Sequence, residues 1–212
     1  MRKDDRIKKQ VDASYYNFDN YVDRSRWMSF YEQILQFHLL PKNSSVLEIG
    51  PGLNLNRKHV EEYLPDITYK TLDIAEDLNP DYLGSVHDIP LPDDSFDAVF
   101  AFEILEHLPF DKFELSLREI KRVVRDRVVI SLPHFGPVVK FLFKVPLIRQ
   151  KQMAVKIPYH PEHSFNGQHY WEIGKKDYSI KKIRLILKKH FTLVKDFIPF
   201  ENQYHHFFIL KK

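Results

Sequence analysis

The sequence predicts an α/β domain in which a doubly wound sheet carries helices on both faces. Short apolar runs with the length of buried strands alternate along the chain with longer segments of helical periodicity, as such a sheet requires. No internal repeat interrupts this alternation. The 212 residues are within the size range of one domain and suffice to bury a sizeable core. We therefore expect residues 1–212 to form a single domain.

The predicted elements follow from periodicity and from the residues that break it. Aromatic and apolar side chains recur at helical spacing over residues 21–40, and Pro41 ends this helix. Strands are predicted at 45–50, 67–73, 83–88, 97–103 and 127–132. Further helices are predicted at 55–64, 111–125 and 177–190. The last two apolar runs, 191–198 and 204–210, predict a C-terminal hairpin, because the connection between them is short.

The first of these strands runs directly into a glycine loop that opens a helix. The loop contains Gly50 and Gly52, two of the chain's six glycines. Glycine lets the backbone approach a ligand closely and adopt positive φ, so this arrangement is typical of nucleotide-cofactor sites. A nicotinamide dehydrogenase would carry a third glycine at the position of Leu55. Its absence disfavours that class.

Two carboxylates near this loop also suggest a ligand. Glu48 lies among apolar strand residues, where an ionised side chain is costly unless it is paired. Its partner is either a cationic group of the ligand or a neighbouring Lys or Arg. Asp73 ends the next strand about 20 residues past the glycines, where a carboxylate can accept hydrogen bonds from ribose hydroxyls. Asp73 alone would suit NAD equally well.

Together with two segments farther along the chain, these residues resemble those of class I S-adenosylmethionine-dependent methyltransferases, and most closely those of the type-11 group. The sequence E-x-G-x-G at 48–52, the acid Asp73, the segment Asp88–Asp97 and the sequence E-x-L-E-H at 103–107 occur in the order of that family. The resemblance covers residues 45–133. It implies a Rossmann-like, seven-stranded sheet, mostly parallel with one antiparallel strand, and S-adenosylmethionine as cofactor.

The resemblance also implies which residues bind the cofactor. The glycine loop would lie against its methionine and ribose part, Asp73 would bind the ribose diol, and Asp88 would contact the adenine amino group. Each Asp could instead cap a helix or turn. Asn54 stands where the family often has a third glycine, and asparagine tolerates positive φ. The implied cofactor-binding residues are Glu48, Gly50, Gly52, Asn54, Asp73, Ile74, Asp88, Ile89 and Glu103.

The cofactor fold does not account for residues 134–176, which leave the sheet at the end of the fifth predicted strand. Ligands of open α/β sheets bind outside the carboxyl ends of the strands, and this segment is rich in aromatic residues and histidines. We predict a substrate lid here; the alternative is a surface excursion with a small core of its own. The other divisions are an N-terminal helical cap at 1–44, a cofactor-binding core at 45–133, and the last helix with the C-terminal hairpin at 177–212.

Two histidines are candidate catalytic residues. His107 follows the fourth strand and is a candidate general base, because imidazole titrates near neutrality; alternatively it holds the loop through a hydrogen bond. His134 follows the fifth strand and could face the acceptor from the opposite wall. No metal site is predicted, since the histidines between 160 and 169 lack the H-E-x-x-H spacing.

The charge and composition of the chain disfavour some classes of partner and of catalytic site. The 32 basic residues are spread among 29 acidic ones for a net charge of +3, which does not indicate a nucleic-acid surface. The absence of cysteine excludes thiolate metal sites and cysteine nucleophiles. With neither a signal-peptide pattern nor a spanning apolar run, we expect a cytoplasmic protein. Residues 135–148 place Lys140 and Lys144 among apolar residues, which indicates a packed helix or contact with a membrane surface.

The predicted function is methyl transfer from S-adenosylmethionine to a small-molecule acceptor, with oxygen favoured and a sugar or lipid-linked precursor as a possible acceptor. Strand four ends in Phe102-Glu103-Ile104-Leu105 and not in the N-P-P-Y or D-P-P-Y sequence associated with amino methylation of nucleic-acid bases. The alternative is a non-catalytic module that binds the same cofactor. The oligomeric state is not predicted.

Overall fold

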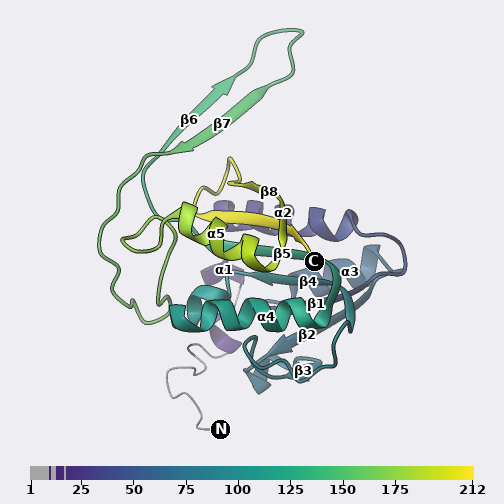
Figure 1. Ribbon diagram of the computed structural model, residues 1–212. Coiled ribbons are helices and arrows are strands. Elements are labelled where there is room, and N and C mark those ends of the chain that lie inside the picture. The colour runs from purple at the N-terminus through teal and green to yellow at the C-terminus, as the bar shows by residue number, and fades with distance from the viewer. Residues whose placement is uncertain (1–9, 11–12, 17) are drawn as a thin grey trace.

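A seven-stranded sheet forms the centre of the molecule in the computed structural model, which describes residues 10, 13–16 and 18–212. The strand order is β3-β2-β1-β4-β5-β9-β8, and helices cover both faces (Figure 1). The strands are β1 (Ser45–Ile49), β2 (Thr68–Asp73), β3 (Tyr82–Leu83), β4 (Phe96–Phe102), β5 (Val124–Pro133), β8 (Thr192–Phe197) and β9 (His205–Lys211). Only β9 runs antiparallel to its neighbours in this sheet, so the predicted fold class is confirmed.

Two apolar clusters pack on opposite faces of this sheet. The helices are α1 (Phe18–Tyr21), α2 (Arg24–His38), α3 (Leu55–Tyr63), α4 (Phe113–Val123) and α5 (Ile180–His190), and the 3-10 helices are η1 (Ala13–Tyr15), η2 (Glu76–Leu78), η3 (Leu105–His107) and η4 (Phe110–Lys112). One cluster includes Leu117 of α4 and Ile183 of α5, and the other includes Phe37 of α2 and Val60 of α3. Because the central strands are covered on both sides, their middle residues are mostly apolar, as in residues 98–102 of β4.

Two helices begin later than predicted because side chains cap them. The Asp23 carboxylate accepts the Arg26 backbone N–H at 2.7 Å, so α2 begins at Arg24 and not at residue 21. Ser179 accepts the Lys182 backbone N–H, so α5 begins at Ile180 and not at residue 177. Such side chains satisfy backbone donors that the first helical turn leaves unpaired.

The third strand is shorter than predicted. It covers Tyr82–Leu83 and not residues 83–88, because the chain then folds back on itself. The Asp88 N–H donates to the Ser85 carbonyl at 2.9 Å, and these two residues form an isolated bridge. As a result, the loop at the carboxyl end of β3 starts about five residues earlier than the sequence pattern suggested.

The segment 135–148 is not a packed helix. Residues Val138–Phe143 (β6) pair antiparallel with Lys151–Lys156 (β7), and Pro137 and Pro146 flank the first of these strands. Proline cannot continue a helix, whereas alternating side chains suit a two-stranded ribbon. This hairpin, residues 138–156, projects away from the sheet (Figure 1), and we call it the arm. Within the described residues, no helix is long and apolar enough to cross a membrane.

Candidate active site

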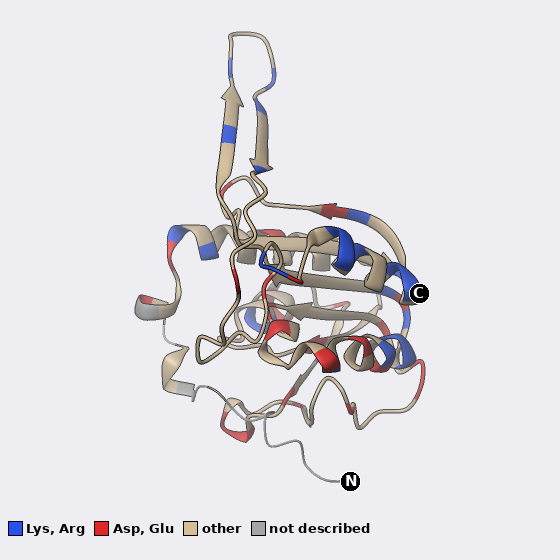
Figure 2. Cartoon of the chain, turned by 60° about the vertical axis from the view of Figure 1, so that its left-hand side comes forward, with Lys and Arg blue, Asp and Glu red and all other residues tan. Residues whose placement is uncertain are grey.

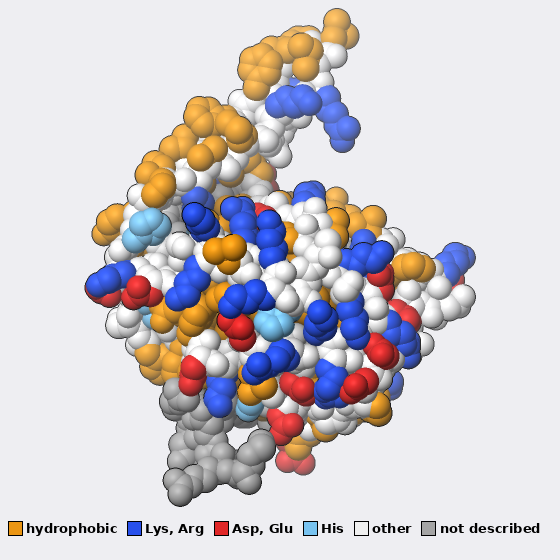
Figure 3. Space-filling view, viewed as in Figure 1, with side chains coloured by type: hydrophobic (Ala, Val, Ile, Leu, Met, Phe, Trp, Pro, Cys, Tyr) orange, Lys and Arg blue, Asp and Glu red, His pale blue; other side chains and the backbone are white. Residues whose placement is uncertain are grey.

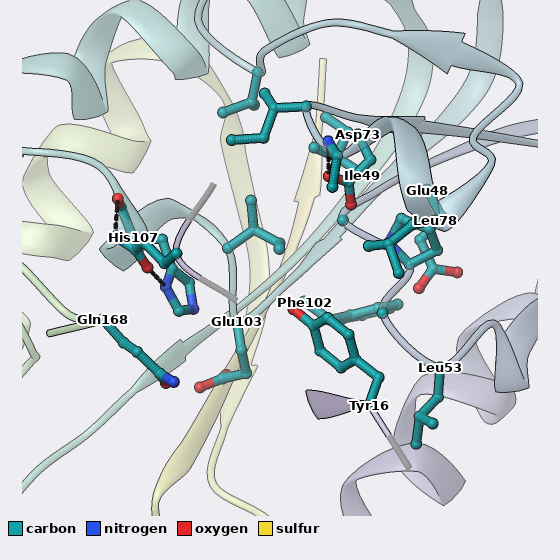
Figure 4. A pocket seen from close by; sticks show the side chains of 18 of the residues that line it. Tyr16, Glu48, Ile49, Leu53, Asp73, Leu78, Phe102, Glu103, His107 and Gln168 are labelled. Atoms are coloured by element: carbon teal, nitrogen blue, oxygen red, sulfur yellow. Dashed lines mark hydrogen bonds between the residues drawn. The ribbon is translucent and has the colours of Figure 1, made fainter. Parts of the chain in front are cut away.

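A pocket lies at the carboxyl ends of β1, β2 and β4, the edge of the sheet where α/β proteins bind ligands. Asp73 and Leu78 lie on one side of it and His107 and Gln168 on the other (Figure 4). We call the first the glycine side; it is lined by Gly50, Gly52, Asp73, Ile74, Ser85 and Val86. The second is the histidine side; it is lined by Glu103, His107, Gln168, His169, Tyr204 and His205.

The glycine loop has a backbone that larger residues cannot adopt without strain. Gly50 and Gly52 have φ of +70° and +51°, in the left-handed region that favours glycine. A Cβ atom at Gly50 would collide with the Ile104 side chain, and one at Gly52 would lie 3.3 Å from the Tyr16 ring. Asn54 also has positive φ, +55°, and precedes α3. It is not among the residues lining the pocket.

Glu48 is held by neutral donors. Its carboxylate accepts hydrogen bonds from the Tyr69 hydroxyl at 2.5 Å and the Asn56 side-chain amide at 3.0 Å. Burial raises the pKa of Glu48 to about 7. Among the described residues, Glu48 forms no ion pair with Lys or Arg, so the structural salt bridge considered from the sequence does not form there. The residue borders the pocket, close enough to be a cofactor contact.

Asp73 ends β2 on the wall of the pocket (Figure 4). One of its carboxylate oxygens accepts the Ala75 backbone N–H at 2.9 Å, so this aspartate caps the turn as well as facing the ligand space. The neighbouring Ile74 side chain is 42% exposed and also lines the pocket. A carboxylate beside an exposed apolar side chain suits a ligand with a ribose and a flat ring system.

Asp88 and Ile89, which the resemblance implied as cofactor contacts, are not among the residues that line the pocket. Ser85 and Val86 occupy that part of the wall. Ile89 is buried in the core and donates its backbone N–H to Glu119. The physical reason is the short β3: the residues at the carboxyl end of a strand face the site, and here those residues come before position 87.

On the histidine side, Glu103 follows β4 with φ of +53°. Its Oε1 is buried and has no hydrogen-bond partner among the described residues, whereas Oε2 lies 3.6 Å from His205 Nε2. Burial raises the pKa of Glu103 to about 8. A left-handed conformation at a glutamate is unusual, and here it turns the carboxylate into the pocket (Figure 4).

Glu106, His107 and His169 form a cluster on the same side. Glu106 is fully buried, and burial, together with nearby Glu103, raises its pKa well above the usual range. Burial and the neighbouring His169 lower the pKa of His107 to about 4, so its imidazole is neutral at pH 7. His107 donates from Nδ1 to Gln10 Oε1 at 2.6 Å. His107, the candidate general base, therefore lines the pocket and contacts His169.

His134 does not reach the pocket. Its ring stacks on His206, with the two Nδ1 atoms 2.9 Å apart, and burial lowers the pKa of His134 to about 3. Of the two adjacent histidines in β9, the one that lines the pocket is His205. Side chains alternate between the faces of a strand, so one of two adjacent histidines in β9 had to face the pocket side; only the pairing of β9 with β5 decides which.

The N-terminal segment contributes pocket residues that the sequence analysis did not identify. Tyr16 and Tyr21 line the pocket, with ring centroids 5.1 Å apart, and the Arg26 guanidinium lies 4.2 Å from the centre of the Tyr21 ring. Burial raises the pKa of Tyr16, so its phenol stays protonated at neutral pH. The cluster of tyrosines before the first long helix was the available signal.

Comparison with known proteins identifies the domain. Residues 47–132 match the family described as a methyltransferase domain. By this match the segment is a methyltransferase domain. None of the curated proteins matches the sequence.

Solved structures share the methyltransferase fold over nearly the whole chain. An S-adenosylmethionine-dependent methyltransferase from Aquifex aeolicus superimposes with a TM-score of 0.60 at 17% identity, covering 95% of this chain and 98% of that one. The 1,6-didemethyltoxoflavin-N1-methyltransferase of Burkholderia thailandensis, with bound S-adenosylhomocysteine, gives 0.61 at 17% identity and covers 94% and 84%. The phosphoethanolamine N-methyltransferase 2 of Haemonchus contortus, in complex with S-adenosyl-L-methionine, gives 0.62 at 14% identity and covers 94% and 56%.

The glycine side of the methyltransferase fits S-adenosylmethionine. Gly50 and Gly52 line the pocket, and because glycine has no side chain a ligand can approach their backbone closely. Asp73 would provide a carboxylate for ribose hydroxyls, and Glu48 a buried carboxylate for a cationic group, since both line the pocket. Ile74, Leu78 and Val86 supply apolar contact area on the same wall.

Proposed function

We propose that this methyltransferase transfers the methyl group to a hydroxyl oxygen of a small-molecule acceptor bound on the histidine side. The observation that carries the proposal is the set of hydrogen-bond acceptors gathered there: the Glu103 carboxylate, whose buried Oε1 has no partner among the described residues, beside His205, a neutral imidazole. A hydroxyl can donate its hydrogen to such a group, and a buried acceptor left without a donor is costly.

In this proposal the residues position the reactants, and the hydroxyl proton passes to the ionised form of Glu103, which its pKa of about 8 populates as the pH rises toward that value. When bound, S-adenosylmethionine supplies an electrophilic methyl group, which leaves sulfur as the acceptor oxygen forms its new bond to carbon. The glycine side holds the cofactor, and the histidine side orients the acceptor oxygen toward the methyl group. Tyr16 and Tyr21 cover the pocket and exclude water. Fixing two reactants in this way can lower a barrier by about 7–11 kcal/mol.

The test combines binding with turnover. Calorimetric titration with S-adenosylmethionine, S-adenosylhomocysteine and NAD should give binding of the first two only. Incubation with radiolabelled S-adenosylmethionine and panels of hydroxyl and amine acceptors should label a hydroxyl acceptor. The variant Glu103→Gln should lower turnover while leaving cofactor affinity unchanged, and the exposed Glu61→Gln should change neither. Labelling of amines alone would overturn oxygen transfer, and cofactor binding without any labelling would favour the non-catalytic module.

We further propose that the acceptor is lipid-linked and that the arm docks on an anionic membrane surface. Cross-strand partners share a face of the hairpin, so one face of the arm carries Val139, Phe141, Phe143, Met153 and Val155. Figure 3 displays the apolar side chains along the arm and at its tip. An isolated hairpin with an exposed apolar face is marginally stable in water, which favours a partner for this face.

The charge of the arm favours a lipid partner. Residues 135–160 contain five basic residues and no acidic one, and the arm is marked by Lys and Arg without Asp or Glu in Figure 2. Each basic residue near an anionic bilayer contributes about 1 kcal/mol. The arm follows β5, which ends at the pocket edge of the sheet, so docking would bring that edge toward the membrane.

Vesicle sedimentation tests this part of the proposal. Vesicles containing phosphatidylglycerol should bind the protein, and pure phosphatidylcholine vesicles should bind it more weakly. The double variant Phe141→Ser with Phe143→Ser should abolish binding, whereas Leu185→Ser, an exposed leucine on α5, should not. Equal sedimentation of the arm variant and the wild type would overturn the docking role.

A further inference from the structure

The histidine side contains an arrangement of ligand atoms that the methyl transfer described above does not require. Oε1 of Glu106 lies 3.9 Å from Nε2 of His107 and 4.0 Å from Nε2 of His169. One ligand atom from each of the three residues lies within 4.8 Å of the others. Metal–ligand distances of about 2.0–2.2 Å place ligand atoms roughly 3.0–3.5 Å apart, so small side-chain shifts would bring all three onto one ion.

Both imidazoles are oriented by a partner on their other nitrogen. Nδ1 of His169 lies 3.0 Å from Oε1 of Glu172, and Nδ1 of His107 lies 2.6 Å from Oε1 of Gln10, whose amide nitrogen donates to the His107 carbonyl. Because both partner atoms are acceptors, each Nδ1 carries the hydrogen and each Nε2 presents its lone pair. Metal-binding histidines in proteins are held in the same way.

Glu106 supplies an independent indication of a ligand. Its side chain is fully buried, and neither carboxylate oxygen has a hydrogen-bond partner among the described residues. A buried carboxylate without a partner is costly, and a cation is one of the few groups that removes this cost. Oε1 lies within 4.0 Å of an imidazole nitrogen of both His107 and His169.

We propose that Glu106, His107 and His169 bind a divalent transition-metal ion on the histidine side of the pocket. Two imidazoles with one carboxylate suit Zn²⁺, Mn²⁺, Fe²⁺ or Co²⁺, and three protein ligands leave coordination positions open. His107 and His169 both line the pocket, so the open positions face the acceptor space. The Glu172 carboxylate is a positioning group, which also accepts the Tyr204 hydroxyl at 2.7 Å.

The role of the ion in catalysis rests on the proposed oxygen transfer. When bound, the ion would lower the pKa of an acceptor hydroxyl that coordinates it, and the ionised form of Glu103 would take up the proton of that hydroxyl. An electron pair of the oxygen then forms the bond to the methyl carbon, while the carbon–sulfur bond breaks and leaves its pair on sulfur. His107 is in this case a ligand and not the general base.

Metal binding is tested without turnover. Metal-free protein is titrated calorimetrically with Zn²⁺ and Mn²⁺, and Co²⁺ is added to record its visible absorption. The wild type should bind one ion per chain. Glu106→Gln and His169→Ala should each abolish binding, and Glu172→Gln should weaken it about 10- to 100-fold. His160→Ala, which removes a histidine of the same segment that contacts the Gly174 carbonyl, should bind like the wild type.

The outcomes separate this proposal from the proposed function. Absence of binding to the wild type, or unchanged binding in Glu106→Gln and His169→Ala, would overturn the metal site even if hydroxyl acceptors are labelled. Metal binding that depends on these residues, without labelling of any hydroxyl acceptor, would retain the site and overturn the oxygen transfer. The titration of the Glu106→Gln variant is informative even if His169→Ala fails to fold, because glutamine keeps the shape of glutamate.

Discussion

The two sides of the pocket are built in different ways. The glycine side is formed by short runs of residues at the ends of β1, β2 and β3, and its shape depends on the backbone, with Gly50 and Gly52 at positive φ. The histidine side is assembled from side chains that are far apart in sequence, such as Glu103, His169 and His205, and several of them are buried and titratable. The first arrangement accepts one cofactor, whereas the second can be varied residue by residue to suit an acceptor.

The largest effect should come from the backbone of the glycine side. Gly50→Ala places a Cβ atom against Ile104 at a left-handed backbone position, and the loop must shift to accommodate it. We expect affinity for S-adenosylmethionine to fall by more than about 1,000-fold, roughly 4 kcal/mol, as measured by calorimetry. Gly136→Ala, also at positive φ but beside the arm, is the control and should keep its cofactor affinity. Wild-type affinity in Gly50→Ala would show that the loop is not a cofactor cradle.

The next effect should come from the ribose contact. Asp73→Ala removes a carboxylate from the pocket wall, and charged hydrogen bonds contribute about 1.5–3 kcal/mol each. We expect cofactor affinity to fall by roughly 100-fold, with an unchanged circular dichroism spectrum. Asp66→Ala, an exposed aspartate before β2 that pairs with Lys42, is the matched control. Equal dissociation constants for Asp73→Ala and the wild type would remove the ribose assignment.

The two sides should also differ in the pH range over which a buried carboxyl lowers the stability of the fold. Glu48 and Glu103 have pKa values raised by burial to about 7 and about 8, above the unfolded value near 4.5. Above that unfolded value the folded state holds more protons, so stability falls as pH rises, by at most about 1.4 kcal/mol per pH unit for each group.

Urea unfolding of metal-free protein between pH 5 and pH 8 measures this slope. Glu48→Gln should flatten the curve up to about pH 7, and Glu103→Gln should flatten it up to about pH 8. The exposed Glu61→Gln should leave the slope as it is. A wild-type stability that does not change across this range would contradict the burial of ionisable carboxylates at both sites.

The smallest effect on cofactor affinity should come from Ser85, the glycine-side residue just after β3. Ser85→Ala removes one hydroxyl from the pocket wall, and a neutral hydrogen bond contributes about 0.5–1.5 kcal/mol, so cofactor affinity should fall by roughly 2- to 10-fold. Asp88→Ala should leave it unchanged, because that side chain lies outside the pocket lining. If calorimetry instead shows weaker cofactor binding for Asp88→Ala and unchanged binding for Ser85→Ala, the adenine contact is at Asp88, as the family resemblance implied.

Most of the fold could be predicted from the sequence because its signals are local. Buried strands with helices on both sides are continuous apolar runs, and they were found within a few residues of their true bounds. The errors arose where a different local interaction competes with the pattern. A turn between Ser85 and Asp88 ends β3 early, and pairing of Phe141 with Met153 makes a hairpin where apolar spacing alone permitted a helix.

By itself, the sequence determined the glycine side, because the glycines, Asp73 and Ile74 follow their strands directly and a strand end places its neighbours at the site. Only the tertiary structure decided the histidine side. His134 was the candidate in sequence and His205 was not, yet His134 stacks on His206 outside the pocket lining and His205 of β9 lines it. Likewise, His169 reaches Glu106 and His107 only because the segment after the arm returns to the end of β4. Contacts between residues far apart in the chain depend on how the elements pack, and no local pattern records that packing.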